Sequence, residues 1–283
     1  MAERSFLVQR FARIDLGQFH VIGYSVAGEE TVVQVPELNV CFDIGRCPLF
    51  ALASPIVCVS HGHMDHIAGL GYYLSQRHFQ GMAPGKVIVP RDLAAPVERL
   101  LSAWRSLERQ NTPYELIPLA AGESYPVRRD FLIRAFQTHH VGESLGYALV
   151  SVREKLRPEY ASLTGPQIAL LRKQGVEVQY RLEVPLVAYT GDTSPAGLDA
   201  CPAAFEAKVL ITELSFIRPN HRREKIHKFG HMHLDDLLER AGRFKNELII
   251  CAHFSTRYHP QEVRRLVESK LPPGLRERVK LWL

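Results

Sequence analysis

The seven residues SHGHMDH at positions 60–66 constrain the fold of this chain more than any other feature. They directly follow the apolar run IVCV at 56–59, and apolar residues with helical spacing follow them at Ile67, Leu70 and Leu74. The segment is therefore predicted to be a loop that joins a strand to a helix. Three imidazoles and one carboxylate within six residues are typical ligands of metal ions, and such a loop presents them from two directions. The sequence therefore predicts a metal site at this loop, to which other parts of the chain contribute further ligands.

The remaining pattern alternates groups of strands with helices. The first half predicts strands at 5–12, 19–25, 30–35, 39–43 and 86–90, and a helix from Asp92 that carries Trp104 on its core side. The second half predicts strands at 114–118, 131–137, 146–153, 184–189, 209–212 and 248–251, and helices at about 233–243 and 261–270. The segment 153–183 differs in character and is expected to hold one helix. Because no linker separates the halves, residues 1–283 are expected to form one α/β domain of packed layers.

Composition narrows the class of protein. Of the 283 residues 46% are apolar and 23% charged, as in ordinary globular proteins, and the net charge of +5 favours an anionic partner only weakly. The five cysteines are scattered and odd in number, which fits a reduced cytoplasmic compartment. No apolar run approaches the roughly 18 residues of a membrane span, and the N-terminus lacks the apolar core of a signal peptide. We therefore expect no membrane association.

Further donors follow other strands or basic segments. A site for two metals needs about eight protein contacts, and the 60–66 segment supplies four of them. Additional candidates stand in short loops at His140, Asp192, His231 and His253. Ligand loops at the ends of successive strands are the usual way in which a sheet holds a site, so these side chains are expected to converge on the first segment.

Several motifs together resemble one known family. They are PELNVCFDIGRCP at 36–48, the SHGHMDH segment, THHVGESLGY at 138–147, YTGDT at 189–193, ITELSF at 211–216, GHMHL at 230–234 and AHFSTRYH at 252–259. The set resembles the metallo-β-lactamase superfamily and, within it, the short, plant-type ribonuclease Z family of tRNA 3′-processing endonucleases. The resemblance implies a four-layer αββα sandwich, a homodimer, and precursor tRNA as the partner.

The resemblance also implies a ligand set for two Zn²⁺ ions, with Mn²⁺ or Fe²⁺ as alternatives. One ion would be held by His61, His63 and His140, the other by Asp65, His66 and His253, and Asp192 would bridge them. Asp43 resembles the carboxylate that orients a ligand histidine in this family. It could equally be a turn-forming residue before Ile44-Gly45.

The implied reaction is attack of a hydroxide on the phosphodiester, which removes the 3′ trailer and leaves a 3′-hydroxyl on the tRNA. By position His231 would give a proton to the leaving oxygen and Glu213 would orient it, with Asp65 also counted in the catalytic set. His233 lies two residues beyond His231, so a shift of this role remains open. Two other functions are considered: a phosphodiesterase for small or cyclic diesters, and a non-catalytic nucleic-acid-binding protein with a structural metal centre.

Substrate contacts are expected from two basic segments. The loop before His231 carries Arg218, Arg222, Arg223 and Lys225, and either binds RNA phosphates or is simply a solvated charged loop. The segment 153–183, with Arg153 and Lys155, is interpreted as a reduced form of the family's substrate-binding arm.

Overall fold

The computed structural model describes residues 11–283, and two mixed β-sheets form its centre. The first has the order β1-β2-β3-β4-β5-β6-β7, with β14 paired to β2; its strands are β1 Ala12–Asp15, β2 His20–Ala27, β3 Glu30–Val35, β4 Val40–Phe42, β5 Ile56–Cys58, β6 Gly85–Pro90, β7 Tyr114–Leu119 and β14 Phe254–Ser255. The second has the order β15-β13-β12-β11-β10-β9-β8; its strands are β8 Ser124–Arg128, β9 Phe131–Gln137, β10 Leu145–Leu156, β11 Gln179–Tyr189, β12 Val209–Glu213, β13 Leu248–Ala252 and β15 Val279–Leu281.

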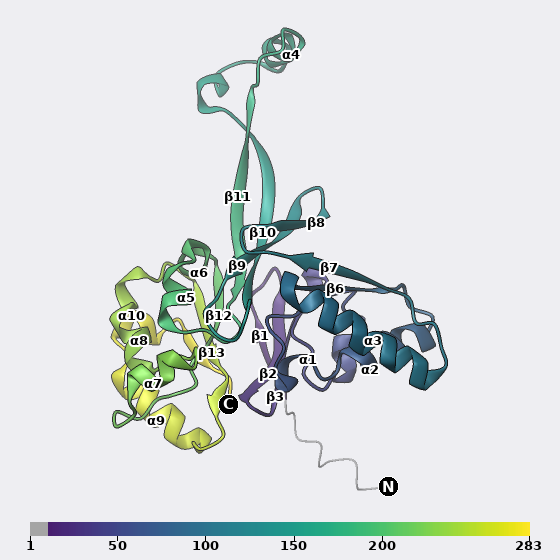
Figure 1. Cartoon of the computed structure of the whole chain (residues 1–283). Coiled ribbons are helices and arrows are strands. Elements are labelled where there is room, and N and C mark those ends of the chain that lie inside the picture. The colour runs from purple at the N-terminus through teal and green to yellow at the C-terminus, as the bar shows by residue number, and fades with distance from the viewer. Residues whose placement is uncertain (1–10) are drawn as a thin grey trace, which may run out of the picture.

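Helices cover the outer faces of both sheets (Figure 1). On the first sheet they are α1 Met64–Ile67, α2 Leu70–Phe79 and α3 Ala94–Glu108. On the second they are α5 Pro195–Asp199, α6 Pro202–Glu206, α7 Arg223–Lys228, α8 Leu234–Glu239, α9 Pro260–Lys270 and α10 Pro273–Arg276, while α4 Gly165–Lys173 covers neither sheet. Apolar side chains of both sheets meet between them, and the rings of Phe42 and Tyr189 stack across this interface at 4.8 Å. The layers confirm the predicted αββα sandwich.

Each sheet contains both parallel and antiparallel strand pairs. Strands β4, β5, β6 and β7 are parallel, and so are β11, β12, β13 and β15. The buried runs of β5 and β13 are apolar on both faces because each has a sheet layer on one side and helices on the other. The carboxyl ends of parallel strands lie at one edge, which is where the loops carrying the predicted donors leave the sheets.

The structure corrects the prediction for Trp104. Trp104 is 45% exposed, and within α3 only Val97 and Leu101 are buried. The apolar stripe of the helix is wider than the surface beneath it, so Trp104 lies over Gly71 of α2 at the margin of the layer. Most of the strand predicted at 5–12 lies outside the described residues, and β1 begins at Ala12.

A two-stranded ribbon protrudes from the second sheet (Figure 1). It is the continuation of β10 and β11, which stay paired out to Leu156 and Gln179, and it carries α4 at its tip. Helix α4 begins at Gly165, after the capping box of Thr164 and Gln167. This ribbon is the segment that the sequence set apart at 153–183. Among residues 11–283, no helix combines the length and apolar character needed to cross a bilayer.

Candidate metal centre

Four strand ends bring the predicted donors together. The loop after β5 carries His61 and His63, and the loops after β9, β11 and β13 carry His140, Asp192 and His253. Between β13 and β14 the chain crosses from one sheet to the other. His253 stands at this crossing with φ +59°, a left-handed conformation that is unusual for a residue with a side chain and is found at functional sites.

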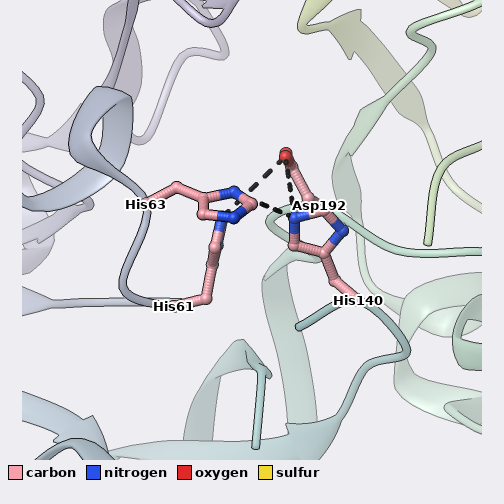
Figure 2. Close-up of side chains that lie close together, drawn as sticks. All are labelled: His61, His63, His140 and Asp192. Atoms are coloured by element: carbon pink, nitrogen blue, oxygen red, sulfur yellow. Dashed lines mark hydrogen bonds and ion pairs between the residues drawn. The ribbon is translucent and has the colours of Figure 1, made fainter. Parts of the chain in front are cut away.

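The first group of donors is His61, His63, His140 and Asp192. Their ligand atoms all lie within 4.8 Å of one another, and Figure 2 shows the side chains pointing toward a common point. The His140 Nε2 lies 3.1 Å from the His63 Nδ1. Gly191 makes the turn before Asp192 with φ +59°, and a Cβ there would lie 2.6 Å from the Cβ of Ser60, so the close approach of these two loops requires glycine.

The second group is Asp65, His66 and His253. The Nε2 atoms of His66 and His253 are 3.4 Å apart, and the Asp65 Oδ2 lies 3.7 Å and 3.5 Å from them. The backbone N–H of Gly28 donates to the same Asp65 oxygen at 2.8 Å and so holds the carboxylate in place.

Asp192 lies between the two groups. Its Oδ2 is 3.7 Å from the Nε2 of His140 in the first group and 3.6 Å from the Nε2 of His66 in the second. Its Oδ1 is 3.4 Å from the His253 Nδ1. One carboxylate thus reaches donors of both groups, which is the position of a bridging ligand.

Hydrogen bonds leave the inward-facing imidazole nitrogens free to bind a metal. The Nδ1 of His66 donates to Asp43 at 2.7 Å, and that of His140 donates to the carbonyls of Phe229 and Gly230 at 3.0 and 3.1 Å. The Nδ1 of His61 donates to Ser60, whose hydroxyl itself donates to Asp43. The buried Nε2 of His61 has no hydrogen-bond partner, a costly arrangement for a structural histidine. The donor set therefore fits metal ligation.

Asp43 is the centre of this supporting network. Its carboxylate accepts hydrogen bonds from the backbone and hydroxyl of Ser60, from His66, and from the Tyr189 hydroxyl at 2.5 Å. It also turns the chain after β4, with φ +53°. Both roles considered for Asp43 from the sequence are therefore compatible with the structure.

The charges of the site act on its histidines in opposite ways. Burial, together with neighbouring imidazoles such as His66, lowers the pKa of His61. Burial also disfavours the charged form of His66, but the carboxylates of Asp192 and Asp43 outweigh this and raise its pKa to about 9. Positive charge is therefore stabilised at the centre of the site, where a bound metal ion would displace protons.

His231 and Glu213 form a pair beside the two donor groups. The His231 Nδ1 donates to the Glu213 Oε1 at 3.0 Å, and the side chain is 20% exposed, so the opposite edge of the ring reaches the mouth of the site. Although burial opposes it, the charge of Glu213 and this hydrogen bond raise the pKa of His231 to about 9. His233 is occupied elsewhere: it caps α8 by accepting from the Asp235 backbone and donates to the Arg218 carbonyl. Both ring nitrogens of His233 are therefore engaged by the backbone.

A family model described as "Beta-lactamase superfamily domain" matches residues 53–254. A chloroplastic tRNase Z of Arabidopsis thaliana is 42% identical over 90% of this chain and 72% of its own length. A second tRNase Z of that plant is 38% identical, over 92% of this chain and 94% of its own length. The chain belongs to the tRNase Z family of this superfamily.

Solved structures agree on the fold. The short form of human tRNase Z superposes with a TM-score of 0.58 at 17% identity, over 92% of this chain and 93% of that chain. A metallo-β-lactamase fold protein of Bacillus subtilis gives 0.60 at 16% identity, over 91% and 92%. At these identities the likeness supports the fold of this tRNase Z family member and no more.

The basic residues predicted to bind substrate fall into two kinds. Arg218 donates two hydrogen bonds to the Glu262 carboxylate, at 2.6 and 2.9 Å. Arg223 forms ion pairs with Asp236 and Glu239, so both arginines already have acidic partners. Arg222 and Lys225 are exposed, but the predicted loop is partly helical here: Arg222 is the N-cap of α7 and Lys225 lies within that helix. Arg153 and Lys155 are exposed on the protruding ribbon.

The sequence did not reveal three hydroxyl groups that support the site. Ser60 links His61 to Asp43, Tyr189 donates to Asp43, and Ser215 accepts from the His253 Nδ1 at 3.1 Å while donating to Glu213 at 2.6 Å. Each stands within or beside a donor motif, and this proximity is the only signal by which the sequence could have pointed to them.

Proposed function

We propose that this chain is a metal-dependent endoribonuclease that removes the 3′ trailer from precursor tRNA and leaves a 3′-hydroxyl on the tRNA. The observation that carries the proposal is the position of Asp192 between two groups of donors, next to the His231 and Glu213 pair. The relatives named tRNase Z give the same assignment at 38–42% identity over most of the chain.

The proposed metal ions are two Zn²⁺, with Mn²⁺ or Fe²⁺ as substitutes. Support comes from the donor chemistry, because five imidazoles and two carboxylates suit zinc. Ions held by His61, His63 and His140 on one side, and by Asp65, His66 and His253 on the other, would supply Lewis-acid activation of water and of the phosphodiester. Asp192 would be a ligand common to both ions.

The protein's own groups supply orientation and a proton. Asp43, Ser60 and the carbonyl of Phe229 fix the rings of the ligand histidines, so the donor atoms need no rearrangement when the substrate binds. Glu213 orients His231 by accepting a hydrogen bond from its Nδ1. The other ring nitrogen, Nε2, can then give a proton to the leaving 3′-oxygen.

The proposal is tested by comparing two substrates. Zinc-loaded protein is incubated with a precursor tRNA that carries a 3′ trailer and with bis(p-nitrophenyl) phosphate. Release of the trailer by a single cut supports the proposal. Turnover of the small diester alone would instead indicate a phosphodiesterase for small or cyclic diesters, and binding of RNA without any turnover would indicate a structural metal centre.

We also propose that the ribbon at 153–183 is a reduced substrate-binding arm. It protrudes from the body and carries six basic and four acidic residues. Leu156 pairs directly with Gln179, so an Asn-Gly turn in place of 157–178 should close the ribbon without changing its register. This variant is expected to lose about tenfold or more in kcat/KM for precursor tRNA, mainly through KM, because contacts remote from the reacting bond are removed. An unchanged KM would contradict the arm assignment, and hydrolysis of the nitrophenyl diester is the control.

A homodimer is the proposed assembly. Its support is an apolar face on the adjacent helices α2 and α3, where Tyr72, Leu100, Trp104 and Leu107 are all exposed. A second copy of the chain would cover these side chains. Light scattering should give twice the chain mass for the wild type and one chain mass for Trp104→Glu, and a wild-type monomer at micromolar concentration would refute the proposal.

The cytoplasm is the proposed location. It is supported by the five cysteines, all of which are buried and free of disulfide bonds. One relative is chloroplastic, and fractionation of cells that express the chain decides between the two compartments.

A further inference from the structure

One large apolar side chain beside the metal centre, that of Phe229, is mostly exposed. The ring of Phe229 is 66% exposed, although the residue lies between α7 and His231. Two other exposed apolar side chains stand next to ligands in the chain: Met64 at the start of α1, at 74%, and Val141 after His140, at 52%. Large apolar side chains are thus exposed beside three of the ligand-bearing segments, where a polar side chain would be better solvated.

The backbone of Phe229 is fixed relative to the metal centre. Its carbonyl accepts a hydrogen bond from the Nδ1 of His140 at 3.0 Å, and its N–H donates to the carbonyls of Lys225 and Ile226, both at 3.2 Å. The following residue, Gly230, has φ +71°, and a Cβ there would lie 2.4 Å from the His140 Cα. The ring is thus presented from a rigid backbone that touches one ligand and precedes the proposed proton donor.

The surroundings of the ring are positively charged. Helix α7, which ends at the residue before Phe229, carries the exposed side chains of Lys225 and Lys228, and Arg222 at its N-cap is exposed too. An exposed aromatic ring beside several cations is the usual arrangement for single-stranded RNA, whose bases stack on the ring while its phosphates contact the cations.

We propose that Phe229 stacks on the base of an unpaired nucleotide next to the scissile phosphodiester and so positions the RNA at the metal centre. The inference rests on the proposed endoribonuclease function and adds a specific substrate contact to it. It concerns the ring alone, because the Phe229 carbonyl that accepts from His140 belongs to the backbone and is unchanged when the side chain is replaced.

The test compares Phe229→Ala and Phe229→Trp with Phe79→Ala. Phe79 is another largely exposed phenylalanine, at the end of α2, and it is not among the residues that approach the donors. Phe229→Ala is expected to lose about 5- to 100-fold in kcat/KM for precursor tRNA, mainly through KM, which corresponds to one stacked base. Phe229→Trp should stay near the wild type, as should Phe79→Ala. Hydrolysis of bis(p-nitrophenyl) phosphate and zinc content should not change in any of them.

Substrates that lack a single base identify the contact. An abasic site is placed on one side of the cleavage position or the other, and each RNA is cleaved by the wild type and by Phe229→Ala. When the missing base is the stacked one, the kcat/KM of the wild type should fall by the same factor that Phe229→Ala causes on intact RNA. The kcat/KM of the variant should not fall further on that abasic RNA.

Two results would overturn the inference. One is an unchanged kcat/KM in Phe229→Ala, and the other is a loss that persists in full on both abasic RNAs. Either is distinct from failure of the proposed function, in which the wild type itself would not cleave any precursor tRNA.

Discussion

Replacing Asp192 by alanine is expected to remove bound metal and nearly all hydrolysis together. Asp192 is buried, and its carboxylate lies 3.6 to 4.0 Å from the Nε2 atoms of His61, His66 and His140, which belong to both groups. Losing the bridge also removes a negative charge that offsets the charge of two dications. The rate of hydrolysis is expected to fall by about a thousandfold or more for both precursor tRNA and bis(p-nitrophenyl) phosphate, because the metal ions supply most of the transition-state stabilisation. Each factor of ten in rate corresponds to about 1.4 kcal/mol of that stabilisation.

The measurement is metal content per chain by mass spectrometry, alongside the two rates. Asp199→Ala is the matched control, since Asp199 is a nearby carboxylate that pairs with Arg240 and Arg243 on the surface of α5. It should keep about two metal ions and the wild-type rate. Asp192→Asn keeps the size of the side chain and should fail in the same way as alanine. Near-native metal content and rate in both Asp192 variants would exclude the bridging role.

The strand pattern predicted packed layers and located the donors for a physical reason, while the αββα arrangement came from the family resemblance. Each donor follows a buried apolar strand or stands within a short motif, as His140 follows β9 and His253 follows β13. The carboxyl ends of strands that run in the same direction lie at one edge of a sheet, so residues that follow such strands can meet there although they are far apart in the chain. The seven predicted ligand side chains indeed lie together.

Contacts that depend on distant pairing could not be predicted in this way. The Tyr189 hydroxyl meets Asp43 across 146 positions, and Ser215 meets His253 across 38, and a hydroxyl carries no local pattern that announces such a partner. Arg218 is neutralised by Glu262, 44 residues away, which a count of basic residues in the loop cannot reveal. Trp104 illustrates the limit of periodicity: the helical pattern gives the direction of a side chain but not the extent of the surface that covers it.

Replacing His231 by alanine is expected to leave the metal content unchanged while slowing the cleavage of precursor tRNA by about 100- to 10,000-fold, the usual contribution of a positioned general acid. The leaving 3′-oxygen of RNA is strongly basic and needs a proton, whereas nitrophenolate is a weak base and needs none. Hydrolysis of bis(p-nitrophenyl) phosphate should therefore change by only a few-fold. Glu213→Gln should show the same substrate dependence in weaker form, because Glu213 orients the ring and stabilises its charge.

His233→Ala is the control that separates the two histidines of the GHMHL motif. His233 caps α8 and is buried, so this variant should lose about 1 kcal/mol of stability with little effect on the ratio of the two rates. If His231→Ala instead slowed both substrates equally, the ring would be acting through the metal site and not through the leaving group. If His233→Ala showed the selective loss, the proton donor would be the second histidine. Because the two side chains are only two residues apart but face different surroundings, the ratio of rates distinguishes them where the loss of either rate alone would not.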